Sequence, residues 1–378
     1  MPRENRFLKV FLSFSLVVLA LVVAAFVGYS WFAPSDITGP PDPTVEGSDH
    51  LDPVIEEEPE QEPTGLIPVE GPEFEPVTVS FTFNGFPYAI TPEVANGVYY
   101  GAIELPRVMH WDPDLTEDQL MEDYYQRLTF DSAMDPAIEY VIAILREVRL
   151  EQDLDSAAYA ELIIKYVQSI PYDHSRLETH AAGDIGPGDP RMPVQTLVDG
   201  TGDCDEKVML AAALLAYEDF SVAALLFEEE AHMALGLKGE GSGYLESAYE
   251  FVELTGPGYV TEVPAEMVGG VILSSTPKVL KLAQGFLVYP QSAVDEVAWI
   301  IHARDTAIDS AEAKRAYIES TWMTDDQFYY ERSLYEAAYV AANSFRVTVD
   351  WDGQPNYENP FMDRPQALDW LAVNYWWQ

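Results

Sequence analysis

The feature that most constrains this chain is one uncharged stretch of 23 residues near the N-terminus, Val10–Phe32. As a helix, a stretch of this length can cross a hydrocarbon core of about 30 Å. Arg3, Arg6 and Lys9 precede it, whereas the segment that follows it is acidic. This asymmetry predicts a single-pass anchor in the cell membrane, with residues 1–9 in the cytoplasm and the main domain extracellular.

A cleaved signal peptide is the alternative for residues 10–32. Signal peptides have an apolar region of about 7–15 residues followed by a small-residue cleavage site. The stretch here is longer and ends in Tyr29, Trp31 and Phe32, aromatic side chains of the kind that collect at a membrane interface. It therefore favours an uncleaved anchor, with the membrane as one partner of the protein.

Residues 33–76 are expected to form a disordered linker rich in proline and acid, as in Glu56-Glu57-Glu58-Pro59-Glu60. Because they lack an apolar period, they cannot bury a core and should be extended. Acid also dominates the whole chain, which has 64 acidic and 20 basic residues and a formal net charge of −44. Such a surface repels phosphate backbones, which excludes nucleic acid as a partner.

Apolar patterns resume at residue 77 and predict an α+β fold in three regions. These are an α/β region at 77–152, a core at 153–268 and an aromatic-rich, mostly helical region at 269–378. The tyrosines between 329 and 339 are expected to lie in the core. Alternation and helical periodicity predict strands at 77–83 and 88–90 joined by an Asn84-Gly85 turn, helices at 116–150, 156–168 and 204–217, strands at 221–227, 232–237 and 249–254, helices near 291–303, 309–321 and 327–343, and a strand at 345–351.

Cys204 is the single cysteine of the chain, so an intramolecular disulfide is excluded. It follows Gly200-Thr201-Gly202-Asp203, in which the glycines permit a sharp turn and Asp203 suits a helix N-cap. The apolar residues behind it place Cys204 in the first turn of a helix, where backbone amides and the helix dipole favour a thiolate. Asp203 and Asp205 oppose this effect through like charge, so the thiol needs a cationic partner such as an imidazolium.

His232 and Glu253 are the candidates for that partnership. His232 opens a strand in which it shares a face with Ala234 and Gly236, small residues that are expected to leave room in front of it. In an antiparallel hairpin the start of this strand lies beside the end of the strand at 249–254, which brings Glu253 next to His232. A carboxylate in this place orients the imidazole and stabilises its cation.

Five segments, taken in order, carry a family resemblance. They are Tyr166-Val167-Gln168-Ser169-Ile170-Pro171-Tyr172, Pro193-Val194-Gln195-Thr196-Leu197, Gly200-Thr201-Gly202-Asp203-Cys204-Asp205-Glu206-Lys207, Ala231-His232-Met233-Ala234-Leu235-Gly236 and Tyr249-Glu250-Phe251-Val252-Glu253-Leu254-Thr255-Gly256-Pro257-Gly258. Together they resemble the transglutaminase-like superfamily in its prokaryotic and archaeal branch, over about residues 155–265. Each segment alone is weak, and their order makes the pattern fairly specific.

The resemblance implies a papain-like fold, with an antiparallel sheet packed on the helix that bears the cysteine. It carries the roles of nucleophile, base and acid onto Cys204, His232 and Glu253, although the family commonly has Asp in the third position. It implies no cofactor. Gln168, Tyr172 and Asp203 are the candidates for contacts to an oxyanion or a substrate, beside the backbone N–H of Cys204.

The activity implied is cysteine acyl transfer by a membrane-anchored, extracytoplasmic enzyme. The thiolate attacks a peptide or amide carbonyl of a protein or peptide substrate, and the resulting thioester passes to water. One alternative is a protein cross-linking transglutaminase, in which a lysine amine takes the acyl group. Another is a catalytically inactive binding or scaffold module.

Simpler interpretations exist for each of these residues. A lone cysteine is more often an inert buried side chain than a nucleophile, and His232 is equally suited to a hydrogen-bonded place in the core. Glu253 fits a solvated strand end, with Glu246 or Glu250 as an alternative third member. Strand alternation turns Glu250 away from Glu253.

The acidic loop from His174 to Pro193 offers a further alternative, a calcium site. Asp173, Asp184 and Asp189 supply the hard oxygen ligands that calcium prefers. The spacing of these residues with His174 and His180 matches no zinc pattern, and a flexible acidic loop is the simpler interpretation.

Overall fold

The computed structural model describes residues 65–109, 111–176, 190–344, 348–349, 355–356 and 362–374. In this part of the chain helices combine with antiparallel sheets, which confirms the predicted α+β class. The elements in chain order are β1 (Val79–Phe83), β2 (Phe86–Ile90), α2 (Asn96–Glu104), α3 (Glu117–Thr129), η1 (Ser132–Met134), α4 (Asp135–Glu151), α5 (Ser156–Gln168), α7 (Pro193–Asp199), α8 (Cys204–Tyr217), β3 (Val222–Phe227), β4 (His232–Lys238), η2 (Tyr244–Glu246), β5 (Tyr249–Val252), β6 (Lys278–Ala283), α9 (Gln291–Ser320), α10 (Asp325–Ser344), β7 (Thr348–Val349), β8 (Pro355–Asn356) and α11 (Arg364–Asn374).

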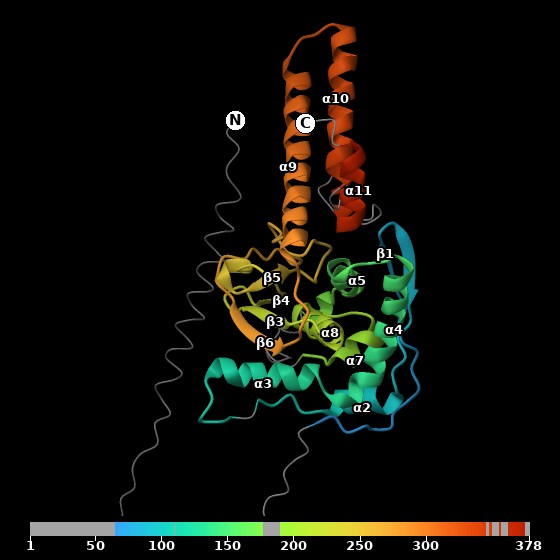
Figure 1. Ribbon diagram of the computed structural model, residues 1–378, viewed down its shortest axis with the longest axis vertical. Helices are drawn as coiled ribbons and strands as arrows, with labels where there is room; N and C mark the ends of the chain where they lie inside the picture. The colour runs from blue at the N-terminus through green and yellow to red at the C-terminus, as the bar shows by residue number, and fades with distance from the viewer. Residues whose placement is uncertain are drawn as a thin grey trace, which may run out of the picture. The chain divides into compact units, whose positions relative to one another are not determined.

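The helix α8 is the centre of the fold. On one side it packs against an antiparallel sheet of order β5-β4-β3-β6, and on the other against α4, α5 and α7 (Figure 1). Residues 206–215 of α8 are all buried, which is the environment of a helix that is apolar on every side. The sheet meets it through Met233, Leu235 and Leu237 of β4, which share one hydrophobic core with α8. The predicted positions of α5, α8 and the strands β3, β4 and β5 are confirmed to within one or two residues.

The predicted hairpin at the start of the folded region is also confirmed. β1 pairs with β2 in an antiparallel register, and the two-residue turn has positive φ at both Asn84 (50°) and Gly85 (79°). Such a turn favours Asn-Gly, because its twist matches that of the strands. The hairpin packs on α5, where the rings of Phe81 and Tyr166 meet edge to face at 5.8 Å.

Ordered packing begins earlier than predicted, so the assignment of residues 65–76 to the linker was wrong. Leu66 is buried, and its N–H donates to Oδ2 of Asp131 at 2.6 Å. The N–H of Val69 donates to the carbonyl of Gly97 in α2 at 2.9 Å. These contacts join residues that are far apart in the sequence. A search for local apolar periodicity therefore did not reveal them.

The long helix predicted at 116–150 is in fact two helices. α3 ends at Thr129, and Asp131 then accepts a hydrogen bond from the N–H of Ala133 to cap the short η1 turn. α4 begins with a proline in its first turn, where the missing N–H costs no hydrogen bond. A short polar side chain that caps a turn therefore divided an otherwise continuous helical pattern.

The region after residue 268 is not separate from the core. β6 pairs with β3 and completes the central sheet, which moves the predicted boundary at 268–269 beyond this strand. α9 is one helix of 30 residues, where two had been predicted. It packs against α10, and its buried Ala303 and Ala307 share apolar clusters with residues of α11, such as Trp370.

The tyrosines of α10 do not form the core that was expected of them. Tyr329 is 67% and Tyr330 is 62% exposed, and Trp322 at the turn before α10 is 91% exposed. Trp370 of α11 packs against the cluster of Val297 and Ile300.

α11 is tied to the core by buried charges. Asp363 lies 3.1 Å from Nζ of Lys165, and Arg364 donates to Glu161 at 2.7 Å. Both lysine and glutamate belong to α5, the helix that packs on α8. Burial raises the pKa of Glu161 to about 7, against the opposing effect of Arg364.

Among the residues that the structure describes, no helix combines the length and the apolar character needed to cross a bilayer. The predicted anchor at 10–32 lies outside these residues.

Gly200 gives a first test of the packing around the α7–α8 turn. It is the C-cap of α7 in the left-handed region (φ 61°), and an added Cβ would lie 2.5 Å from Cβ of Val77. We expect Gly200→Ala to lower the free energy of unfolding by about 1–2 kcal/mol or more, as measured by urea denaturation. Gly258→Ala is the matched control, since its Cβ would meet nothing within 4 Å. Equal stability of the two variants would contradict this account of the turn.

Candidate active site

The cysteine sits where the sequence predicted it, at the first position of α8. A capping box holds this helix start: the N–H of Glu206 donates to Oδ1 of Asp203 at 3.3 Å, and the N–H of Asp203 donates to Oε2 of Glu206 at 3.1 Å. Cys204 is partly exposed. Its own backbone N–H has no hydrogen-bond partner within the described ranges, as expected for the first residue of a helix.

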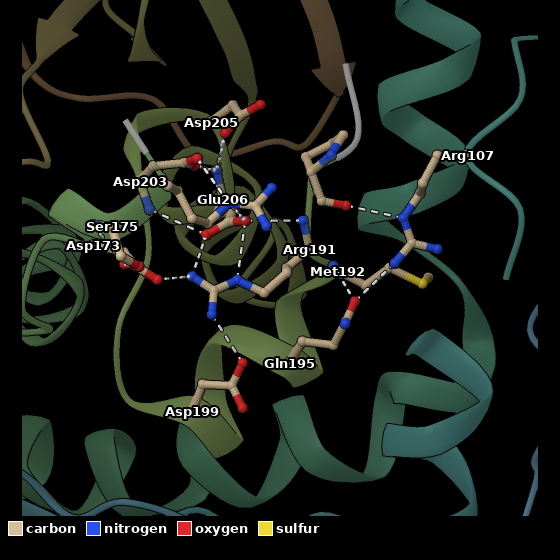
Figure 2. Close-up of polar contacts among 12 residues, drawn as sticks. Arg107, Asp173, Ser175, Arg191, Met192, Gln195, Asp199, Asp203, Asp205 and Glu206 are labelled. Atoms are coloured by element: carbon tan, nitrogen blue, oxygen red, sulfur yellow. Dashed lines mark hydrogen bonds and ion pairs between the residues drawn. The ribbon is translucent and has the colours of Figure 1, made fainter. Parts of the chain in front are cut away.

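Arg191 and Arg176 both bind the buried carboxylate of Glu206 and fix this helix start; Figure 2 shows the contacts of Arg191. Arg191 donates to both oxygens of Glu206, at 3.0 and 2.8 Å, and its remaining nitrogen reaches Asp199 at 2.9 Å. Nε of Arg176 lies 3.0 Å from Oε1 of Glu206 and 3.3 Å from Oδ2 of Asp203. The arginines compensate a carboxylate that is inaccessible to solvent, and so they hold the loop before α7 against the helix that carries the cysteine.

The segment Pro171–Asp173 lies along the turn that precedes the cysteine. The N–H of Gly202 donates to the carbonyl of Pro171 at 3.2 Å, and the N–H of Asp173 donates to the carbonyl of Gly202 at 3.1 Å. These bonds bring Tyr172 beside the start of α8. Burial raises the pKa of the Tyr172 phenol, and the charge of Cys204 raises it further. Tyr172, a candidate for contact with a substrate, therefore lies near the thiol.

The imidazole and the carboxylate meet as predicted. Nε2 of His232 lies 3.0 Å from Oε2 of Glu253, and both side chains are buried. Thr255 donates to the other oxygen, Oε1, from its N–H at 2.7 Å and from its hydroxyl at 2.5 Å. Burial opposes the charge of Glu253, but His232 and Thr255 outweigh it and hold the pKa of this carboxyl below its usual value. Glu246 is exposed and Glu250 pairs with Leu237 further along the hairpin, so Glu253 is the partner of the histidine.

The register of the hairpin differs slightly from the prediction. Leu235 pairs with Val252 and Lys238 with Tyr249, so a continued ladder would set Thr255, and not Glu253, opposite His232. The glutamate therefore reaches the histidine diagonally, from just beyond the end of β5. Its side chain is one methylene longer than that of aspartate, which suits it to this longer reach.

The space expected in front of His232 is filled. Ala234 packs in a second apolar cluster with Phe227 and Phe251, and a Cβ at Gly236 would meet the side chain of Tyr249 at 3.0 Å. By strand alternation His232 belongs to this same face, and its ring centroid lies 6.4 Å from that of Phe227. The small residues thus accommodate aromatic rings and do not open a cleft.

The thiol of Cys204 interacts with the start of β4, the strand that begins at His232. The N–H of Met233, the residue after His232, lowers the pKa of the Cys204 thiol, and the charge of Glu253 raises it. No hydrogen bond joins the thiol to the His232 ring in the part of the chain that is described here. The three predicted residues therefore gather around the start of β4, with the imidazole bonded to the carboxylate alone.

The surroundings of the thiol disfavour its ionised form. Burial raises the pKa of Cys204 well above its ordinary value, and the charges of Asp205 and Asp203 raise it further, against the opposing effect of the Met233 N–H. Burial and Asp203 in turn raise the pKa of Asp205. The prediction that carboxylates would oppose the helix dipole is thus supported, and a resting thiol is the favoured state.

One residue near the thiol was missed in the sequence. Tyr125 of α3 is buried, and after burial the charges of Asp205 and Cys204 are among the causes that raise the pKa of its phenol. It lies 79 positions before the cysteine in the sequence, and only the packing of α3 on α8 brings it to the site. No motif around Tyr125 signalled this position.

Gln168 does not have the role proposed for it. Its Nε2 donates to the carbonyl of Glu253 at 2.8 Å and to the carbonyl of Gly258 at 3.0 Å. An amide nitrogen has two hydrogens, so neither is left for an oxyanion. Gln168 instead fixes the backbone that follows β5, and the Cys204 N–H remains the donor that the site offers.

The calcium interpretation finds no support at Asp173. Its carboxylate bonds to Ser175 at 2.5 Å and to Arg191 at 2.8 Å, so a guanidinium occupies the place of a cation. Asp184 and Asp189 lie outside the described residues. Within the described ranges no cluster of His, Cys, Asp and Glu side chains is arranged to hold a metal ion.

Comparisons with known proteins found no matching protein-family model, curated protein or solved structure.

Asp205 provides a test of the electrostatics around the thiol. The charge of Asp205 raises the pKa of Cys204, so Asp205→Asn removes a negative charge next to the sulfur and favours the thiolate. We expect the pH midpoint of iodoacetamide alkylation to fall by about one unit. Since Cys204 is the single cysteine, the mass of the intact protein reports the reaction directly.

Asp309→Asn, on an exposed position of α9, is the control for the change in net charge and should leave the midpoint in place. An unchanged midpoint in Asp205→Asn would contradict the close charge interaction between this carboxylate and the thiol.

Proposed function

We propose that this protein is a membrane-anchored, extracytoplasmic cysteine acyl-transfer enzyme that hydrolyses a peptide or amide bond in a protein or peptide substrate. The observation that carries the proposal is the buried pair of His232 and Glu253, 3.0 Å apart, at the start of the strand whose next N–H, that of Met233, lowers the pKa of the Cys204 thiol. A papain-like, transglutaminase-like arrangement is the family form that these positions fit. The anchor at residues 10–32 is part of the same proposal.

In the proposed reaction His232 acts as a general base at the moment of attack. The raised pKa of Cys204 argues against a standing thiolate, so the proton leaves sulfur as the C–S bond forms at the substrate carbonyl. The proton then passes from His232 to the departing amine as the C–N bond breaks, which leaves a thioester. Water, deprotonated by His232, attacks the thioester and releases the acid and the thiol.

Glu253 holds the histidine ready for this transfer. Its contact to Nε2 leaves Nδ1 as the ring nitrogen that exchanges the proton, and its carboxylate stabilises the imidazolium that forms. In this proposal the N–H of Cys204 serves as a donor to the oxyanion, and the N–H of Met233, which lowers the pKa of the thiol, favours negative charge on the sulfur.

A non-catalytic binding or scaffold module is the second candidate. Two observations favour it: the raised pKa of the thiol and the imidazole that is bonded to the carboxylate alone among the described residues. A cross-linking enzyme that uses a lysine amine in place of water needs the same three residues. The acyl acceptor, water or an amine, therefore distinguishes the hydrolase from the cross-linking enzyme. The formation of an acyl-enzyme distinguishes both of them from a binding module.

One assay distinguishes the three. Full-length protein is incubated with denatured casein, with and without a dansylated primary amine, and the products are analysed by mass spectrometry. Hydrolysis yields new N-termini, and transfer yields dansylated glutamine. We expect hydrolysis, and we expect Cys204→Ser and His232→Ala to reduce it by about 10³-fold or more.

Glu253→Gln should reduce the rate as well, because the amide cannot stabilise the imidazolium. Glu246→Gln, on an exposed position of the same hairpin, should retain the wild-type rate. Dansylation without cleavage would show that the protein is a cross-linking enzyme and not a hydrolase. Product that is unaffected by Cys204→Ser, or no product at all, would leave the binding module as the function.

A further inference from the structure

Lys207 is a charged side chain with no contact to solvent. It lies one turn after Cys204 on α8 and is fully buried. Lysine is among the residues least often found in such a position, and the reaction proposed above makes no use of it. Its environment therefore calls for a separate explanation.

The stem and the head of Lys207 touch two different parts of the site. Its Cγ packs close to Gly202, where an added Cβ would lie 3.3 Å from it. Its Nζ donates to the carbonyl of Ile170 at 2.6 Å and to the carbonyl of Gln168 at 3.4 Å. These carbonyls end α5, where a helix leaves its last acceptors without partners, so the ammonium joins the nucleophile helix to the end of α5.

Gln168 extends this link to the histidine pair. Its backbone accepts from Lys207, while its side chain donates to the carbonyl of Glu253. A continuous path of hydrogen bonds thus runs from α8 through the end of α5 to the residue that binds His232. The next residues of the same segment pair with Gly202 before the cysteine, so one ammonium supports both sides of the site.

Lys207 also interacts with Glu253 through charge. Glu253 is the charged group that acts on Lys207, whereas Glu206 at the start of α8 binds Arg176 and Arg191. Burial lowers the pKa of Lys207 to about 7, against the smaller effect of Glu253. The ammonium therefore carries its charge on the acid side of neutrality.

We propose that Lys207 is a positioning residue of this active site, which holds Glu253 in place for His232 through Gln168 and stabilises its carboxylate by charge. The inference rests on the proposed function. It assigns to Lys207 a role in the geometry of the proton transfer, and not a contact with the substrate. A residue that merely filled the core would support the fold without affecting how the site responds to pH.

The experiment follows the acylation of Cys204 by 4-nitrophenyl acetate in the full chain, with the acetyl thioester detected by intact mass, across pH 5 to 9. In Lys207→Met an apolar chain of similar length removes the charge and the donors. We expect acylation to slow by about tenfold to a hundredfold. We also expect the acid limb of the pH profile to move up by about 0.5 unit or more, because a site without the nearby cation holds a proton more readily.

Two further variants separate position from charge and from stability. Gln168→Leu breaks the path but keeps the ammonium, so it should slow acylation and leave the acid limb where it is. Leu214→Ala removes buried volume from the same helix and should lower stability without a change in either readout. If Lys207→Met does not fold, Gln168→Leu tests the path by itself.

The outcomes distinguish this inference from the function beneath it. If wild-type acylation is no faster than that of His232→Ala at any pH, the proposed function fails. If the wild type depends on His232 while Lys207→Met and Gln168→Leu keep its rate and profile, the function stands and Lys207 is a structural residue only. A folded Gln168→Leu with the wild-type rate likewise overturns the hydrogen-bonded path.

Discussion

The fold around the candidate site depends on the burial of one carboxylate, that of Glu206. A charge removed from water must be compensated within the protein, because desolvation of a carboxylate costs several kcal/mol. Here the compensating groups are the guanidinium groups of Arg191 and Arg176, which both lie between α5 and α7 in the sequence, and the N–H of Asp203. Satisfying this group therefore fixes the helix start, the preceding turn and the adjoining loop together, and Cys204 is positioned as a consequence.

The same arrangement makes the site acidic. Asp203 caps the helix and Asp205 follows the cysteine, so two carboxyl groups flank the sulfur whose ionisation they oppose. Lys207 lies one turn further along α8, and its charge interacts with that of Glu253. The electrostatics thus keep the proton on sulfur and the negative charge on Glu253, which is the starting state for a proton transfer coupled to attack.

Local sequence patterns were sufficient for the elements nearest the site. The cap at Asp203, the apolar helix behind it and the alternation of β4 and β5 are each decided by residues within a few positions of one another. The pairing of His232 with Glu253 followed from hairpin geometry, although the register was shifted. The patterns failed where a contact joins distant segments. Asp131 divides a helical pattern and binds Leu66, and β6 joins the sheet after a long excursion from β5.

The sequence by itself determined that Cys204 begins a helix and that His232 opens a strand, because capping and periodicity act over one or two turns. The tertiary structure alone decided what surrounds them. Phe227 and Phe251 fill the space expected to be open in front of His232. The packing of α3 brings Tyr125 close to the thiol. Gln168 donates both hydrogens of its side-chain amide to backbone carbonyls. These outcomes depend on how helices and strands pack across long separations in the chain, and no local pattern of residue types encodes that packing.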